Sequence, residues 1–151
     1  MEKQFEILRQ NRMAILKIME AFSLNQLNKI PSGFKNNIAW NVAHLLVTQQ
    51  LLCYALAELP MHLSEDLIAR YRKGTAPQQP MTQEELDLVK SLFVFLIDRF
   101  ENDYQEGKFK KFSSYTTSTS IVLNSIEDAL TFNNYHEGIH TGSILALSKL
   151  V

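Results

Sequence analysis

Ile38-Ala39-Trp40-Asn41-Val42-Ala43-His44-Leu45-Leu46 lies within residues 35–59, a segment that is apolar on nearly every side and stops before Pro60. Because the residue before a proline disfavours helical geometry, this segment predicts one long helix that ends there. A helix that is apolar all round is either central in its fold or covered by a partner. A histidine in its middle must be hydrogen-bonded or coordinated, since an unpaired buried ring nitrogen costs free energy. His44 is therefore the first candidate functional residue.

Apolar spacing and capping patterns predict three further helices. Thr82 and Glu85 form a capping-box pattern, and Ser125 with Asp128 gives a similar cap. Arg12 interrupts the apolar stripe of the first helix, but its apolar neighbours lead us to expect that the face stays apolar. The three further helices cover residues 3–25, 82–104 and 125–149.

Four long helices with little strand signal predict an all-α fold, a four-helix bundle formed by one domain over residues 1–151. The long connection 60–81 lets the third helix run parallel to the second, and 64–72 is a candidate short helix within it. A second long connection covers residues 105–124. Its β-prone part, residues 116–123, has no obvious partner strand.

Composition excludes several classes of protein. The formal net charge of −1 gives no electrostatic footprint for nucleic acid. One cysteine, Cys53, allows no intramolecular disulfide and fits a reducing compartment, so we expect a cytoplasmic protein. The N-terminus lacks the pattern of a signal peptide, and no apolar run is long enough to cross a membrane.

The strongest chemical signal is His136-Glu137-Gly138-Ile139-His140. Two histidines four residues apart share one helix face, so both imidazoles can reach one metal ion. In metalloproteases with this motif the glutamate is the general base and a third ligand usually follows downstream. Residues 141–151 contain no His, Asp, Glu or Cys, so a third ligand must come from upstream.

Two histidines remain as the third ligand. His62 follows Pro60 at a helix exit, where exposed histidines are ordinary. His44 lies in an apolar helix, and at 1.5 Å per residue its level matches that of His136 and His140 if the two helices are antiparallel. The spacing thus permits a site of three histidines.

Trp40-Asn41-x-x-His44 followed by His136-x-x-x-His140 resembles the DinB/YfiT-like metalloenzymes. The similarity covers nearly the whole chain and includes Ser125-Ile126-Glu127-Asp128-Ala129. It implies an up-down-down-up four-helix bundle, often dimeric, in which His44, His136 and His140 hold a divalent metal. The family includes metal-dependent S-transferases and isomerases that use low-molecular-weight thiols, beside many members without known activity.

Three neutral imidazoles leave a divalent ion its full charge and an open position, where it lowers the pKa of a bound water or thiol. Imidazole suits Zn, Ni or Fe, so the metal is not specified. Asn41, Trp40 and Glu137 are candidates for supporting the ligands or lining a substrate pocket. Glu137 is about 100° around the helix from His136 and is a poor general base; no other catalytic residue is identified.

Two functions remain open. One is a metal-dependent enzyme that attacks a small electrophile with a thiol or water. The other is a metal-binding or stress-related protein without turnover, whose site is structural or vestigial.

Apolar residues surround the predicted helices 35–59 and 82–104, and a second subunit is the simplest cover. We therefore expect a homodimer through these two helices. Gly138 and Gly142 are expected to permit close helix contact, because glycine inside a helix costs about 1 kcal/mol relative to alanine.

Overall fold

The computed structural model describes residues 1–151 and is mostly helical, with a single small hairpin, which confirms the all-α prediction. Four helices are long: α1 (Glu2–Met19), α3 (Ile38–Gln49), α5 (Gln83–Gln105) and α6 (Ile126–Leu147). Two are short: α2 (Leu24–Asn28) and α4 (Glu65–Tyr71). A π-helix, η1 (Gln50–Ala55), extends α3, and strands β1 (Tyr115–Thr116) and β2 (Val122–Leu123) form the hairpin.

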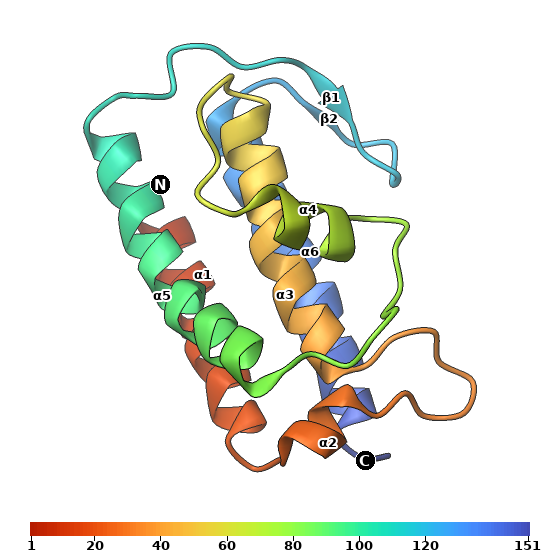
Figure 1. The fold of residues 1–151 in the computed structure, drawn as a ribbon. Helices are drawn as coiled ribbons and strands as arrows, with labels where there is room; N and C mark the ends of the chain where they lie inside the picture. The colour runs from red at the N-terminus through yellow and green to blue at the C-terminus, as the bar shows by residue number, and fades with distance from the viewer.

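Each long helix packs against two others, in the cyclic order α1, α6, α3 and α5. In Figure 1, α1 and α6 run downward, whereas α3 and α5 run upward. Helices α3 and α6 are therefore antiparallel, the arrangement that brings His44 to the level of His136 and His140.

The apolar core has two clusters. One gathers around α3 and includes Ile15, Val47, Leu96 and Ile144. The other lies toward the N-terminal ends of α1 and α6 and the C-terminal half of α5; it includes Leu8, Leu52, Ile97 and Leu130. Along α1, α3 and α6 the buried polar residues Arg12, Gln49 and Glu137 fall between these two sets. A polar layer thus separates the two apolar clusters.

The first predicted helix, residues 3–25, is broken. Helix α1 ends at Met19, and Ser23 begins α2 with a capping box: its hydroxyl accepts from the Gln26 N–H, while the Gln26 side chain accepts from the Ser23 N–H. Because two backbone donors are satisfied there, a new helix start is favoured over continuation.

The second predicted helix, residues 35–59, starts later and changes type. The Asn37 side chain accepts from the Trp40 N–H and sets the start at Ile38. From Gln50 the helix widens to π geometry and ends at Ala55, before the left-handed residue Glu58 (φ 58°). Consecutive Gln49 and Gln50 are both buried, and they bond to Arg12 and to the His62 N–H respectively.

Thr82 and Ser125 cap α5 and α6 as predicted, and α4 confirms the short helix expected within residues 64–72. Helix α4 packs against α3, where residues 38–47 are all buried inside this one chain. The chain itself thus supplies the cover that the sequence assigned to a partner. On α5, Leu88 and Phe95 are exposed, and the homodimer through α3 and α5 stays a prediction.

The expectation that residues 116–123 have no partner strand is wrong. The segment folds back on itself: Tyr115 pairs with Leu123 and Thr116 with Val122, antiparallel. Ser120 turns the chain at positive φ (63°), and the Thr117 hydroxyl accepts from the Ile121 N–H. The partner lies within the same short segment, which a search for a separate strand overlooks.

Candidate metal centre

His44 on α3 meets His136 and His140 on α6. One ligand atom from each histidine lies within 4.8 Å of the others, and the ring centroids are 4.5 to 5.2 Å apart. The four-residue spacing puts His136 and His140 on one face of α6, and that face packs against α3. No other histidine joins the cluster, since His62 lies against Tyr54 and Asp103.

Hydrogen bonds fix the ring of His44, which is only 4% exposed. Its Nδ1 lies 2.6 Å from the carbonyl oxygen of Tyr71, at the end of α4, so Nδ1 carries the proton and donates it. Nε2 is then unprotonated and carries a lone pair, and the Thr48 hydroxyl lies 3.3 Å from this nitrogen. This arrangement is typical of metal ligands, whose second nitrogen usually donates to a carbonyl or carboxylate.

His140 is held in the same way by Asn41. Its Nδ1 is 2.7 Å from Asn41 Oδ1. The amide nitrogen of Asn41 donates to the Asn37 carbonyl oxygen (2.7 Å) and to Asn36 Oδ1 (3.2 Å), so the amide oxygen must face the histidine. The Asn41 amide oxygen therefore accepts a hydrogen bond from Nδ1–H of His140, and Nε2 of that ring carries the lone pair that can bind a metal.

The third ring, His136, has a buried Nδ1 with no hydrogen-bond partner in the protein. Buried polar atoms are nearly always paired, so this one marks a place built for a ligand other than protein. Burial, with the nearby His140 and His44, lowers the pKa of His136 to about 3. Burial and His44 lower the pKa of His140 to about 4, and burial lowers the pKa of His44 despite its bond to Tyr71. All three rings are neutral at pH 7, the form that binds metal.

Trp40 is the aromatic wall of the cluster. Its ring stacks on His44 with centroids 4.6 Å apart and an interplanar angle of 11°. Its Nε1 donates to the Thr75 hydroxyl at 3.3 Å, which satisfies the indole. The residue lies in the core and also lines the pocket in front of the histidines.

That pocket has a volume of about 610 Å³, within the range of roughly 300–1,000 Å³ for small-molecule sites. Leu51, Leu52 and Phe132 form part of its apolar wall, and Thr117 of the hairpin lies at its edge. No carboxylate lines it, and apart from the histidines Lys73 is its one ionisable cation. The hairpin and the connection around Lys73 are pocket walls that the sequence did not identify.

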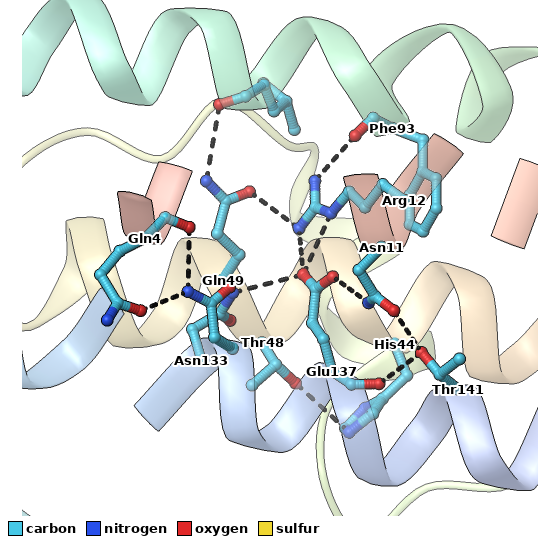
Figure 2. A network of polar contacts seen from close by, with 12 residues as sticks. Gln4, Asn11, Arg12, His44, Thr48, Gln49, Phe93, Asn133, Glu137 and Thr141 are labelled. Carbon is cyan, nitrogen blue, oxygen red and sulfur yellow. Dashed lines mark hydrogen bonds and ion pairs between the residues drawn. The ribbon is translucent and has the colours of Figure 1, made fainter. Parts of the chain in front are cut away.

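Glu137, between the two histidines in sequence, is turned away from them. Figure 2 shows its carboxylate facing Arg12 of α1. Arg12 Nη2 and Nε lie 2.7 and 3.0 Å from Glu137 Oε1, and Asn11 donates to Oε2 at 3.1 Å. A position 100° around the helix from His136 faces α1, whereas the histidines face α3.

Arg12 corrects a prediction. The residue is fully buried, so the face of α1 is not uniformly apolar. Its guanidinium also donates to the Phe93 carbonyl oxygen (2.9 Å) on α5 and to Gln49 (3.3 Å) on α3. One arginine thereby joins all four long helices at the level of the histidines, as Figure 2 shows.

Cys53 lies in the second apolar cluster, fully buried, and burial raises the pKa of its thiol. It does not line the pocket, so the chain presents no thiol of its own to the histidines. No helix is both long and apolar enough to span a membrane.

Comparison with known families gives one match. Residues 7–144, and with them all three histidines, match the family described as the DinB superfamily. No curated protein matches the chain. The family match covers most of the sequence and agrees with the resemblance carried by Trp40, Asn41 and the three histidines. The chain belongs to the DinB superfamily.

Proposed function

We propose that this protein is a divalent-metal-dependent enzyme in which His44, His136 and His140 hold the metal and a small molecule binds in the adjoining pocket. The supporting observation is the histidine cluster: three neutral rings, two with their outer nitrogens fixed by carbonyl acceptors, open onto one pocket. Zn, Ni and Fe all suit three imidazoles. We also propose that the four long helices, which run in the directions seen in Figure 1, form the up-down-down-up bundle that the family resemblance implies.

The reaction we favour is S-transfer. When bound, a divalent ion supplies one property, a lower pKa for a thiol or water that it coordinates. A low-molecular-weight thiol would then lose its proton to water, and its sulfur would form a bond to a carbon atom of a small electrophile. The bond from that carbon to the leaving group would break, and the leaving group would depart with the electron pair. The chain contributes no thiol to the pocket, so the thiol must be a co-substrate.

The protein's own residues orient the ligands and select the substrate. Asn41 and the Tyr71 carbonyl hold two rings in the required tautomer. Leu51, Leu52 and Phe132 exclude water from one side of the pocket and favour an apolar substrate portion. A metal ion and Lys73 are both cationic, and no lining carboxylate balances them, so we propose that the electrophile carries an acidic group.

A metal assay beside an activity assay tests the proposal. Purified wild type should contain stoichiometric metal, and the triple variant with His44, His136 and His140 changed to Ala should contain none. Wild type should conjugate a small thiol to a generic electrophile, and His44→Ala should abolish this turnover. Absence of bound metal from protein purified without chelator and then offered Zn, Ni and Fe would refute the proposal.

A second function, a metal site without turnover, is favoured by one observation. No carboxylate lines the pocket, and Glu137 is engaged by Arg12, so no carboxylate is available there as a general acid or base. For this function, metal removal would lower the melting temperature while no thiol conjugation is detected in the metal-loaded protein.

A further inference from the structure

The pocket in front of the histidines is long rather than round. The residues of α3 and η1 that line it recur mostly every three or four positions, which places them in one stripe along the helix: Trp40, His44, Thr48, Leu51, Leu52, Ala55 and Leu56. At about 1.5 Å per residue this stripe extends over roughly 24 Å, whereas a round cavity of about 610 Å³ would be roughly 10 Å across. A substrate that fills the pocket is therefore an elongated molecule.

One end of the pocket is cationic. The Tyr71 carbonyl oxygen accepts from His44. The Thr75 hydroxyl accepts from Nε1 of Trp40. Lys73 lies between these two contacts in the chain and lines the pocket, which places it beside the histidines. None of the ion pairs in the protein includes Lys73, so its ammonium group is free to bind an anionic ligand.

The other end of the pocket is an apolar arm. Beyond Thr48, the helical residues that line it are all apolar: Leu51, Leu52, Ala55, Leu56 and Phe132. The Ser113 N–H donates to the Leu56 carbonyl oxygen at 2.7 Å, and the hairpin that follows Ser113 closes the arm with uncharged residues. From His44 to Leu56 the arm is roughly 18 Å long. It suits an apolar chain, since a single ring would leave most of this length unfilled.

We propose that the electrophile of the S-transfer reaction is a straight-chain carboxylic acid. Its carboxylate binds Lys73, its chain extends along the apolar arm, and its leaving group is on the carbon next to the carboxylate, in front of the histidines. The thiol loses its proton to water, and its sulfur bonds to that carbon as the leaving group departs with the electron pair. The reacting carbon rests on the proposed function, whereas the places of carboxylate and chain rest on the pocket alone.

Binding of straight-chain alkanoates to metal-free and zinc-loaded protein tests the proposal. Trp40, the only tryptophan, reports occupancy of the cationic end by its fluorescence, and calorimetry measures affinity. From hexanoate through octanoate to decanoate, affinity should rise about fourfold for each added CH₂ group, which corresponds to about 0.8 kcal/mol. Octanol should bind about fivefold more weakly than octanoate, because it has no charge to pair with Lys73.

The Ala55→Phe variant tests the path of the chain. Ala55 is exposed to solvent and lies in the apolar arm, so phenylalanine there should fill the arm and leave the fold intact. Hexanoate, whose chain is too short to reach position 55, should bind as it does to wild type. Decanoate should bind this variant about as weakly as hexanoate does.

Ala146→Phe is the matched control. Ala146 is exposed on α6, one turn beyond Gly142, and does not line the pocket. A Cβ added at Gly138 or Gly142 would meet nothing within 4 Å, so the close helix contact expected at these glycines is absent within the chain and a larger side chain has room nearby. This variant should bind all three alkanoates as wild type does.

Zinc content, measured in the same samples, separates the acid-binding pocket from the metal-dependent reaction. Affinity that rises with chain length in protein that takes up no zinc would support the acid-binding pocket and refute the proposed reaction. In zinc-loaded protein, three results would each overturn the acid-binding pocket alone: affinity that does not rise with chain length, a rise that Ala55→Phe leaves unchanged, or octanol that binds as tightly as octanoate.

Discussion

Replacing Glu137 with glutamine separates the two roles that its position suggests. As the glutamate of a His-Glu-x-x-His motif it is expected to act at the metal; in the structure it is 1% exposed and holds the fully buried Arg12. Its Oε1 accepts two Arg12 N–H groups and one from Asn133 (3.3 Å), and its Oε2 accepts one from Asn11. Every contact is structural, so we expect the change to affect stability and leave metal binding intact.

The size of the effect follows from these contacts. Glutamine removes the negative charge beside a buried cation and replaces one acceptor oxygen with a donor NH₂ group. An amide donor must then face either Asn11 or Arg12, both of which donate in wild type. Breaking one side of a buried ion pair costs about 3–5 kcal/mol. That is a large part of the roughly 5–15 kcal/mol that stabilises an ordinary domain.

Urea unfolding of the metal-free protein measures this loss, compared at equal m-values. Glu84→Gln is the matched control, because Glu84 is exposed in the first turn of α5 and should change stability by less than about 0.5 kcal/mol. Metal affinity of Glu137→Gln, measured below its melting temperature, should equal that of wild type. The reasoning fails if the variant is as stable as wild type or if it folds normally and loses the metal.

Three further predictions concern the pocket and its ligands. Zinc at 100 times its dissociation constant should stabilise wild type against unfolding by about 2.7 kcal/mol. The Asn41→Ala variant should bind zinc about 10–100-fold more weakly, because His140 loses the acceptor of its Nδ1–H group. Calorimetry measures both effects, and equal zinc affinities of variant and wild type would contradict the role of Asn41. The metal-free protein should lose stability as pH falls below about 6.5, because the histidines of the unfolded chain bind protons below that pH. In the folded protein the lowered pKa values keep His136 neutral down to about pH 3 and His140 neutral down to about pH 4. By pH 5 each of the two histidines should lower the free energy of unfolding by at most about 2 kcal/mol, and by less than that because the pocket is open to water. Urea unfolding measures this loss, and the free energy of unfolding of a His136→Gln, His140→Gln variant should depend less on pH than that of wild type. Lys73→Ala should lower kcat/KM about tenfold for an anionic electrophile and leave a neutral one of similar shape unchanged; equal losses for both would remove charge selection.

Local patterns in the sequence were sufficient for most of the fold. Apolar spacing located the four long helices, and capping residues fixed the starts of α5 and α6. Errors arose where local signals competed. Ser23 begins a new helix inside an apolar stripe that continues past it. A π-helix follows Gln49, where the adjacent buried side chains of Gln49 and Gln50 bond to different parts of the chain.

The candidate site was only partly predictable. His136 and His140 are a local pattern, and His44 was found because a histidine in an apolar helix needs a partner. Tyr71 and Lys73 belong to the long connection 60–81, and the hairpin belongs to the connection 105–124. No local pattern in either connection indicates that it folds back onto the histidines. Arg12 was misread for a related reason: its partner Glu137 lies 125 residues away, so no local pattern distinguishes a paired arginine from an interruption.

The pentapeptide from His136 to His140 serves two neighbouring helices at once. Successive helical residues differ by 100°, so the histidines face α3 while Glu137 faces α1. A buried ion pair is weak evidence for stability, because an apolar pair of similar volume often does as well. Its charge requirement, however, permits one rotation of α6 about its axis: any other rotation leaves Arg12 buried without its carboxylate. That same rotation directs His136 and His140 toward His44. Glutamine at position 137 keeps an acceptor oxygen for Arg12 and so keeps this rotation, whereas an apolar replacement of both residues removes the constraint. We therefore expect Arg12 and Glu137 to position the histidines, and Arg12→Met, Glu137→Leu protein to bind zinc more weakly than wild type even where its stability is preserved. Unchanged zinc affinity in that double variant would refute this role.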